Sequence, residues 1–255
     1  MALLHVHDFG DPNGRPLLAL HGIMGHGGRF RRAATDAWPE RRTIAVDLRG
    51  HGRSTSDGPW SIAQHVTDVI DTLDAFGIAS TDVVAHSYGG AIALALLARS
   101  PGRIDRLVLL DPALHTPAEN GTANALAAIS FEGFRSPDEA IEARSPADDA
   151  TRAAIAIDVA EHLVEGEDGR FRYRFHPPAV ITGWGELCSP IPRLAATPPT
   201  LLVAATRAPF VTPEVEADLR AQLGEQLSTV RIDSGHMLYW ERFDDTVAAV
   251  SAFLA

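Results

Sequence analysis

The chain has 255 residues, a formal net charge of −11, 45% apolar residues and a single cysteine, Cys188. This length and apolar content are sufficient for a sizeable hydrophobic core in one domain, with or without an insertion. The acidic balance argues against binding to nucleic acid or to an anionic membrane surface, and one cysteine excludes an internal disulfide and a cysteine-based zinc site.

The sequence also bears on where the protein resides. Its first residues carry histidines and an acid early and lack the basic and then apolar pattern of a secretion signal. The apolar stretch 91–98 is too short to span a membrane and is interpreted as a buried helix. We therefore expect a soluble, cytoplasmic protein without a membrane span, a cofactor or a metal; the sequence leaves open whether it is a monomer or a homodimer.

Strands and helices alternate through the first part of the chain. Apolar runs predict strands at residues 2–6, 16–20, 42–47 and 103–111, and a further strand begins at Thr81. An amphipathic helix is predicted from Ser61, a suitable N-cap, to Phe76, with Gly77 as the residue that ends it. This alternation predicts a mostly parallel, doubly wound α/β sheet with helices on both faces.

The strand that begins at Thr81 leads into a pattern typical of a nucleophile elbow. Its β-branched run ends at Ala85, Ser87 follows, and Gly89 opens an alanine- and leucine-rich helix. Such a strand–turn–helix connection needs small residues two before and two after the serine, and it lifts the serine hydroxyl clear of the sheet. The helix N-terminus favours an anion at the same place, which suits acyl transfer. The alternative interpretation is that Ser87 only caps a buried helix.

A glycine-rich loop follows the predicted strand at 16–20. It reads His-Gly-Ile-Met-Gly-His-Gly-Gly over residues 21–28, and glycines at this density let the backbone approach a ligand closely. A phosphate-binding turn is the alternative, but neither its Gly-Lys-Ser/Thr ending nor a Gly-x-Gly-x-x-Gly spacing is present. A strand ending in His-Gly-x-x-Gly, followed by a serine elbow, resembles the α/β-hydrolase superfamily, in its serine esterase and lipase-like branch with a helical cap. The resemblance implies that the backbone N–H groups of Ile23 and Tyr88 form the oxyanion hole.

The regular alternation stops between residues 114 and 193. Helical fragments are predicted at 123–129, 136–144 and 148–163, before an extended arginine and aromatic stretch at 169–175 and a proline-bearing loop. Such a stretch can stack nucleic-acid bases, but an acidic chain favours a hairpin or extended segment. The resemblance implies a mostly helical cap at 114–193, inserted in a hydrolase core of residues 1–113 and 194–255. In the second part of the core, strands are predicted at 200–205 and 228–232 and helices at 213–223 and 243–254.

A histidine lies where the family keeps its catalytic base. His236 stands in the loop that follows the last predicted strand, and the order nucleophile, acid, histidine is the one that this fold uses. The resemblance therefore implies that Ser87 and His236 act as a catalytic pair.

The acid departs from the family's commonest pattern. Its usual position, in a turn after the next-to-last strand, is occupied by Ala208. Some members of the family instead place the acid at the end of the strand after the elbow helix, and Asp111 stands there. We predict that Asp111 completes a Ser-His-Asp triad; the alternatives are a structural Asp111 with Asp233 or Glu241 as the acid.

The resemblance implies a serine hydrolase that cleaves a small to medium carboxylic ester through an acyl-enzyme. Lactones, amides and the carbon–carbon bonds of β-diketones remain alternative substrates. A different class of function on the same fold is a weakly hydrolytic ligand receptor or a cofactor-free lyase. Turnover of short p-nitrophenyl esters distinguishes a receptor from an esterase.

Overall fold

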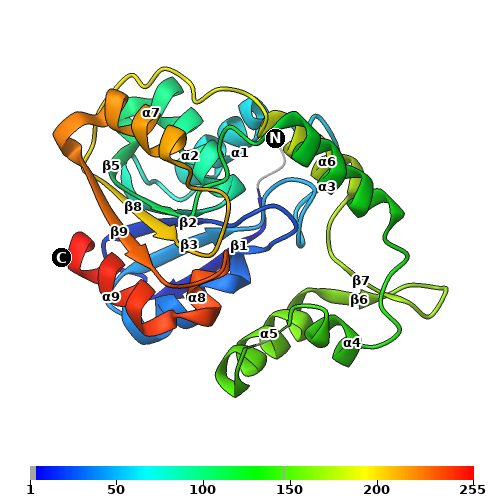
Figure 1. The fold of residues 1–255 in the computed structure, drawn as a ribbon. Helices are drawn as coiled ribbons and strands as arrows, with labels where there is room; N and C mark the ends of the chain where they lie inside the picture. Colours follow the sequence, from blue (N-terminus) through cyan, green and yellow to red (C-terminus); the bar gives the residue numbers. More distant parts are fainter. Residues whose placement is uncertain (1–3, 146) are drawn as a thin grey trace.

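A seven-stranded sheet of order β1-β3-β2-β4-β5-β8-β9 forms the centre of the computed structural model, which describes residues 4–145 and 147–255 (Figure 1). The strands are β1 (Val6–Gly10), β2 (Pro16–Leu20), β3 (Arg42–Val46), β4 (Thr81–His86), β5 (Ile104–Leu110), β8 (Thr200–Ala205) and β9 (Leu227–Ile232). Only β1 pairs antiparallel, with β3; the other pairings in this sheet are parallel. The predicted fold class is thereby confirmed.

Helices cover both faces of the sheet because its central strands are apolar on both sides. In β2, Leu18 and Leu20 pack in one core cluster, whereas Leu17 and Ala19 pack in the other. The first face carries α1 (Ile62–Ala75), α2 (Tyr88–Arg99) and α7 (Pro213–Leu223), and the second carries the short turns η1 (Gly27–Phe30) and η2 (Ala33–Ala37) with α8 (Leu238–Glu241) and α9 (Phe243–Leu254). Figure 1 shows the two layers on opposite sides of the strands.

The helix predicted at 61–76 is confirmed, together with its caps. The Ser61 hydroxyl accepts a hydrogen bond of 3.3 Å from the Gln64 N–H, as an N-cap does. Gly77 has a φ of +69°, the left-handed conformation that ends many helices and that glycine adopts without strain.

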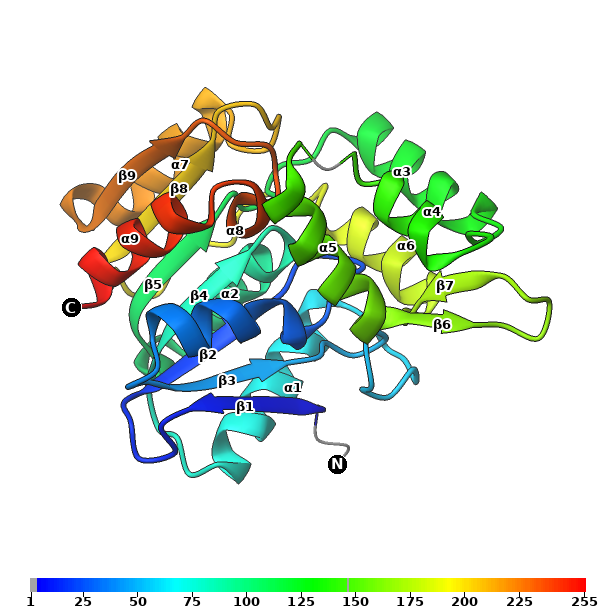
Figure 2. The same cartoon turned by 90° about the horizontal axis from the view of Figure 1, so that it is seen from below.

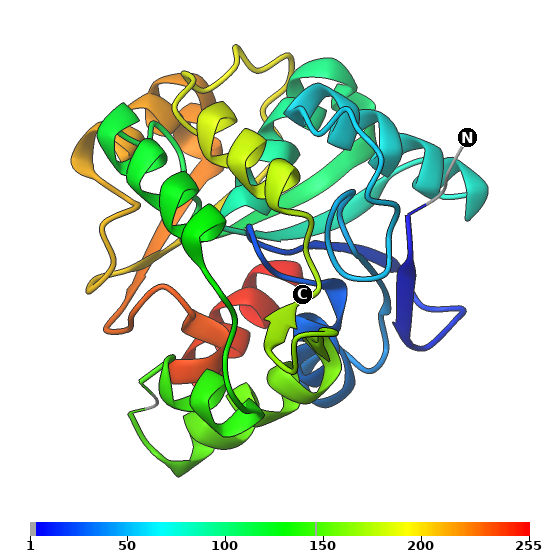
Figure 3. The same ribbon diagram turned by 90° about the vertical axis from the view of Figure 1, so that its right-hand side faces the viewer.

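Residues 114–193, which we call the cap segment, form mainly helices. They are α3 (Ala118–Ser130), α4 (Pro137–Glu142), α5 (Asp149–His162) and α6 (Pro177–Glu186), with the antiparallel pair β6 (Leu163–Glu165) and β7 (Phe171–Tyr173) between α5 and α6. Figures 2 and 3 show these elements gathered at one end of the sheet, with α3 beside α6 and α4 beside α5. The exact boundaries of this segment stay a prediction.

Three sequence predictions were wrong in place or type. The edge strand was predicted at 2–6, but β1 begins at Val6, because its register pairs Val6 with Val46 and Gly10 with Arg42; residues 1–3 lie outside the described part. The stretch after residue 175 was predicted as a proline-bearing loop, whereas Pro177–Glu186 form α6 with prolines in its first turn, where they cost no hydrogen bond. Helix α3 begins at Ala118, earlier than the predicted 123.

Within the described residues, no helix is both long and apolar enough to cross a membrane.

Candidate active site

Ser87 lies in a strained turn between β4 and α2. Its φ of 54° and ψ of −118° fall in a region that residues other than glycine rarely adopt, and such strain concentrates at functional sites. The Ser87 N–H donates to the Leu110 carbonyl at 3.1 Å, and its own carbonyl accepts from Gly90 N–H at 2.9 Å. Gly89 allows this turn, since a Cβ there would lie 2.4 Å from the Leu20 carbonyl oxygen. The sequence therefore folds into the predicted strand–turn–helix connection.

The loop after β9 carries His236, and hydrogen bonds from two neighbouring segments fix its backbone. The Nε2–H of His86 donates to the His236 carbonyl at 2.9 Å, and the Arg207 N–H donates to the Ser234 carbonyl at 3.0 Å. Burial lowers the pKa of His86 well below that of a free imidazole, so His86 is neutral at pH 7 and acts through its single N–H. His86 and His236 lie with ring centroids 4.6 Å apart.

Asp111 meets His236 directly. Its Oδ2 accepts a hydrogen bond of 2.6 Å from His236 Nδ1, and its Oδ1 accepts one of 3.1 Å from the Ala205 N–H. The Asp111 side chain is fully buried, whereas His236 is 26% exposed. A proton on Nδ1 leaves the lone pair of Nε2 free, which is the tautomer that a general base needs.

The two other candidate acids are engaged elsewhere. Glu241 accepts from the Gly235 N–H at 2.8 Å and from Arg207 at 3.2 Å, and the exposed Asp233 pairs with Arg207 at 3.3 Å. The turn at Ala208 presents no carboxylate to His236. Phe210 from the same loop packs its ring against the His236 ring instead, with centroids 4.1 Å apart.

Gly22, Ile23, Met24 and Gly25 form a tight turn that lies against Ser87. A Cβ added to Gly22 would lie 2.9 Å from the Ser87 Cβ, so only glycine permits this approach. The Gly22 carbonyl accepts from Gly25 N–H at 3.0 Å and from His21 Nδ1 at 2.7 Å.

The tautomer of His21 fixes the direction of this turn. The Leu48 N–H donates to His21 Nε2 at 2.9 Å, so the ring proton is on Nδ1 and points at the Gly22 carbonyl. Because the peptide bond is planar and trans, the Ile23 N–H in that unit points the opposite way from the Gly22 oxygen. Tyr88 is the first residue of α2, and its N–H has no acceptor within the helix. The structure thus brings all five predicted site residues to the same end of the sheet.

Helix α6 of the cap segment lies against this end. A Cβ added to Gly183 in α6 would lie 2.9 Å from Ile23 Cδ1 and 3.4 Å from Tyr88 Cζ, so α6 packs directly on both residues. Ser87 is only 3% exposed. Among the described residues, no hydrogen bond joins Ser87 Oγ to His236.

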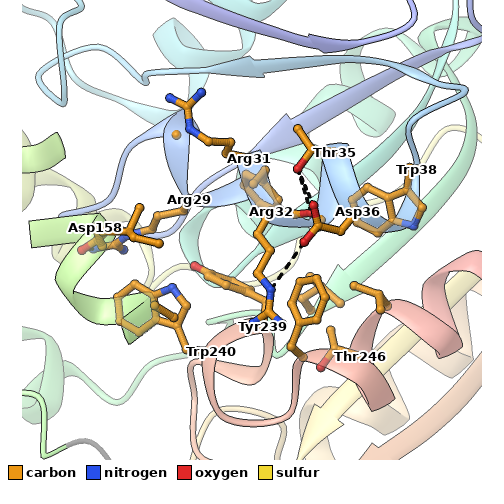
Figure 4. Close-up of a pocket in the computed structure, with 18 of the residues that line it drawn as sticks. Arg29, Arg31, Arg32, Thr35, Asp36, Trp38, Asp158, Tyr239, Trp240 and Thr246 are labelled. Carbon is orange, nitrogen blue, oxygen red and sulfur yellow. Dashed lines mark hydrogen bonds and ion pairs between the residues drawn. The ribbon is translucent and has the colours of Figure 1, made fainter. Parts of the chain in front are cut away.

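Neither of two sizeable cavities in the described part of the chain is lined by Ser87 or His236. One, of about 380 Å³, lies between α5, η2, α8 and α9 and is drawn in Figure 4. The other, of about 320 Å³, lies between α1, α2 and the residues that follow α6. Both have mainly apolar walls.

One group in the described part has the composition of a metal site: His5, His7 and Asp47, whose ligand atoms lie within 4.8 Å of one another. Asp47 already accepts hydrogen bonds from His7 Nε2 at 3.0 Å, from Gly27 N–H at 2.7 Å and from Arg53 N–H at 2.8 Å. These bonds explain the buried carboxylate as a brace between β1 and two loops.

Sequence reasoning missed several residues around the site. His86 and Phe210 contact His236, and Arg29 forms a buried ion pair with Asp158. His86 is adjacent to Ser87 in sequence, which is a usable signal. Nothing in the sequence pattern links Arg29 with Asp158, since they are 129 residues apart.

Comparison with known proteins classifies the chain as a whole. A family model described as "Alpha/beta hydrolase family" matches residues 17–250. Lipase LipV of Mycobacterium tuberculosis is 34% identical, over 98% of this chain and 97% of that protein. Esterase YbfF of Escherichia coli is 29% identical, over 95% of this chain and 94% of that protein.

A solved structure shows the same fold at lower sequence identity. That of E-2-(acetamidomethylene)succinate hydrolase superimposes with a TM-score of 0.86 at 21% identity, covering 98% of this chain and 94% of the other. The match of the family model over most of the chain, together with LipV, decides the classification. The chain belongs to the α/β hydrolase family.

Proposed function

We propose that this protein is a serine hydrolase that cleaves carboxylic esters with Ser87 as nucleophile, His236 as general base and Asp111 as the acid. The observation that carries the proposal is the 2.6 Å hydrogen bond between His236 Nδ1 and the buried Asp111 carboxylate, beside a serine in a strained turn. A buried carboxylate on Nδ1 both sets the tautomer and stabilises the imidazolium that forms during attack.

The first half-reaction forms an acyl-enzyme. His236 Nε2 takes the proton of the Ser87 hydroxyl as its oxygen attacks the ester carbonyl carbon. The carbonyl oxygen becomes an oxyanion, which accepts hydrogen bonds from the N–H groups of Ile23 and Tyr88. The tetrahedral intermediate then collapses, and the imidazolium gives its proton to the departing alcohol.

Water completes the reaction. His236 takes a proton from a water molecule, whose oxygen attacks the acyl carbon. The second tetrahedral intermediate releases Ser87, which recovers its proton from the imidazolium, and the carboxylic acid leaves. Ser87 Oγ and His236 need to approach for the first proton transfer, and catalytic hydrogen bonds often tighten only when substrate is bound.

The surroundings of Ser87 bear on the kind of acyl group that the proposed site accepts. The segment 114–193, as the proposed cap, lies over a site walled by Ile23, Phe210 and the α6 glycine Gly183. These apolar walls favour a hydrocarbon acyl group, and the proposed substrates are small to medium esters. LipV and YbfF, a lipase and an esterase by name, support an ester as the substrate class.

A fluorophosphonate probe tests the proposal. It phosphonylates an activated serine and needs the oxyanion hole at the same time. We expect one adduct, located by mass spectrometry on the peptide that contains Ser87, and none in the Ser87→Ala variant. Hydrolysis of p-nitrophenyl esters of increasing acyl length should accompany the labelling. Labelling without turnover points to a ligand receptor, and labelling at another serine contradicts the assignment of the nucleophile.

A further inference from the structure

Helix α5 of the cap segment inserts a buried carboxylate into the core next to the Gly22–Gly25 turn. Asp158 is 3% exposed, and its Oδ1 accepts from Arg29 Nε at 2.8 Å and from His26 Nε2 at 2.9 Å. Its Oδ2 accepts from Arg29 Nη2 at 3.3 Å. Figure 4 shows Asp158 and Arg29 side by side, next to Trp240. The contact joins a cap helix to the core loop at 26–29.

This ion pair holds both of its members in their charged forms. Burial alone raises the pKa of Asp158, but the Arg29 guanidinium and the His26 hydrogen bond outweigh burial and hold that pKa well below its usual range. Arg29 itself is 4% exposed. Removing one partner of such a pair leaves the other charge buried without compensation, which is strongly unfavourable. The ion pair therefore favours one position of α5 in the cap segment relative to Arg29.

Arg29 also reaches the Gly22–Gly25 turn. Its Nη2 donates to the Met24 carbonyl at 3.5 Å, and a Cβ added to Gly25 would lie 2.9 Å from its Nη1. His162, one helical turn after Asp158 on α5, brings Nε2 to 3.3 Å from the same Met24 carbonyl. Two donors, one on the core and one on the cap segment, thus converge on one oxygen.

Met24, whose carbonyl accepts both hydrogen bonds, has a strained backbone conformation. Met24 has a φ of 57°, a left-handed conformation that is strained for a residue with a side chain. Such a conformation persists only where the surroundings hold it. The Met24 carbonyl shares a peptide unit with the Gly25 N–H, which donates to the Gly22 carbonyl at 3.0 Å. The Gly22 carbonyl in turn shares a peptide unit with the Ile23 N–H, so a rotation at Met24 that breaks this bond frees that N–H to turn.

We propose that Asp158 and His162 are positioning residues that hold the Gly22–Gly25 turn, through Arg29 and the Met24 carbonyl, in the conformation that aims the Ile23 N–H at the oxyanion. This inference rests on the proposed ester hydrolysis. Its consequence is that one half of the oxyanion hole is assembled only while the cap segment is seated. Opening of the cap and loss of catalytic competence are then a single event.

A charge-neutral variant tests the proposal kinetically. Asp158→Asn keeps the shape of the side chain but removes the charge that orients Arg29. We expect kcat to fall by about 10- to 100-fold, less than the loss of a whole oxyanion donor, with KM within about threefold. A trifluoromethyl ketone, whose adduct with serine carries an oxyanion, should bind weaker by the same factor as kcat/KM falls. A non-reacting ether analogue should bind as it does to the wild type.

The matched control lies on the same cap segment. Glu142→Gln removes a carboxylate from an exposed ion pair with Arg152 and should leave kcat within about twofold of the wild type. Arg29→Lys is the second variant, used if Asp158→Asn does not fold. It keeps a positive charge next to Asp158 but removes the guanidinium Nη2 that donates to the Met24 carbonyl, and we expect the same fall in kcat.

Hydrogen exchange gives a readout that does not depend on activity. Amides in peptides covering residues 21–28 should exchange faster in Asp158→Asn than in the wild type or Glu142→Gln. If the wild type has no esterase activity but exchange changes as expected, the proposed function fails and the positioning role of Asp158 stands. If a folded Asp158→Asn or Arg29→Lys keeps wild-type kcat and exchange, or loses activity through KM alone, the inference is wrong.

Discussion

Asp111 and His236 are joined by a 2.6 Å hydrogen bond between side chains that are 125 residues apart in sequence. Asp111 follows β5, which pairs directly with β4, the strand that leads to Ser87. Ser87, the proposed nucleophile, and Asp111, the proposed acid, therefore follow neighbouring strands. The loop after β9 brings His236 into contact with Asp111. The β8–α7 loop, where the family more often keeps its acid, contributes the ring of Phe210 instead.

The first prediction concerns this hydrogen bond. Asp111→Asn keeps the shape of the side chain but offers a donor where His236 Nδ1–H needs an acceptor. We expect kcat to fall by roughly 10²- to 10⁴-fold with a smaller change in KM, because the wrong tautomer is favoured and the imidazolium loses its counter-charge. Steady-state kinetics on a p-nitrophenyl ester measures both. Full activity in this variant would exclude Asp111 as the acid.

A second-site change extends that test. Ala208→Asp restores a carboxylate to the turn where the family more often has one. If both turns address the same nitrogen of His236, the double variant Asp111→Asn/Ala208→Asp should recover at least part of the lost kcat. The single variant Ala208→Asp serves as the control for any effect of the new charge on the wild-type site.

The second prediction concerns the nucleophile. Ser87→Ala should lower ester turnover by about 10⁴-fold or more, because the remaining groups cannot form the acyl-enzyme. Alanine fits the elbow, so the far-ultraviolet circular dichroism and the unfolding midpoint should stay close to those of the wild type. A variant that keeps a tenth of wild-type kcat shows that another residue is the nucleophile.

The third prediction concerns the close approach of α2 to β2. Gly89→Ala brings a Cβ to 2.4 Å from the Leu20 carbonyl oxygen, and neither backbone segment is free to move. We expect the free energy of unfolding to fall by about 3 kcal/mol, as for other overpacked sites. Urea denaturation measures it. Gly102→Ala is the matched control, because its Cβ meets nothing within 4 Å and should change stability by less than about 0.5 kcal/mol.

The fourth prediction concerns acid. Burial lowers the pKa of His51 to about 4 and the pKa of His65 to about 3. An unfolded histidine titrates near pH 6.5, so below that pH the unfolded chain binds protons at both positions that the folded protein does not bind. Stability is therefore complete above about pH 7 and falls as the pH decreases, by about 1.4 kcal/mol per pH unit for His65 between pH 6 and 4. The slope that His51 contributes drops to about half of this value as the pH reaches its folded pKa of about 4.

The variant that isolates this effect is His65→Met. It removes one buried titrating group, and the slope of unfolding free energy against pH between 6 and 4 should become shallower by about 1.4 kcal/mol per pH unit. Denaturant unfolding at a series of pH values supplies the slope. An unchanged slope would show that His65 contributes nothing to acid sensitivity.

The local features of the fold were predictable because each rests on a short stretch of sequence. The apolar run of β2, the caps of α1 and the small residues of the elbow all act over a few residues. The edge strand was misplaced because its position depends on pairing with β3, which lies thirty or more residues away. Helix α6 was missed because Pro177 and Pro178 indicate a break in most contexts, whereas at a helix start they are favourable.

The candidate site residues could be predicted from the sequence for a similar reason. Ser87, Tyr88 and Ile23 belong to short motifs, and Asp111 and His236 follow strand ends, which a family pattern places. The partners that support them lie in no motif. The contact of Arg29 with Asp158 and that of Phe210 with His236 join loops and helices that only the tertiary structure brings together.

The position of Asp111 directly after β5 also affects when the site can form during synthesis. A chain is made from its N-terminus, and the residues proposed to attack the ester, hold the oxyanion and orient the base all precede the cap segment. Only His236 comes after it, and its loop reaches Asp111 once β9 has paired with β8. In the proposed mechanism, Ser87 of a growing chain therefore lacks its base until β9 is in place, so its hydroxyl gains nucleophilic strength only once the whole sheet has assembled.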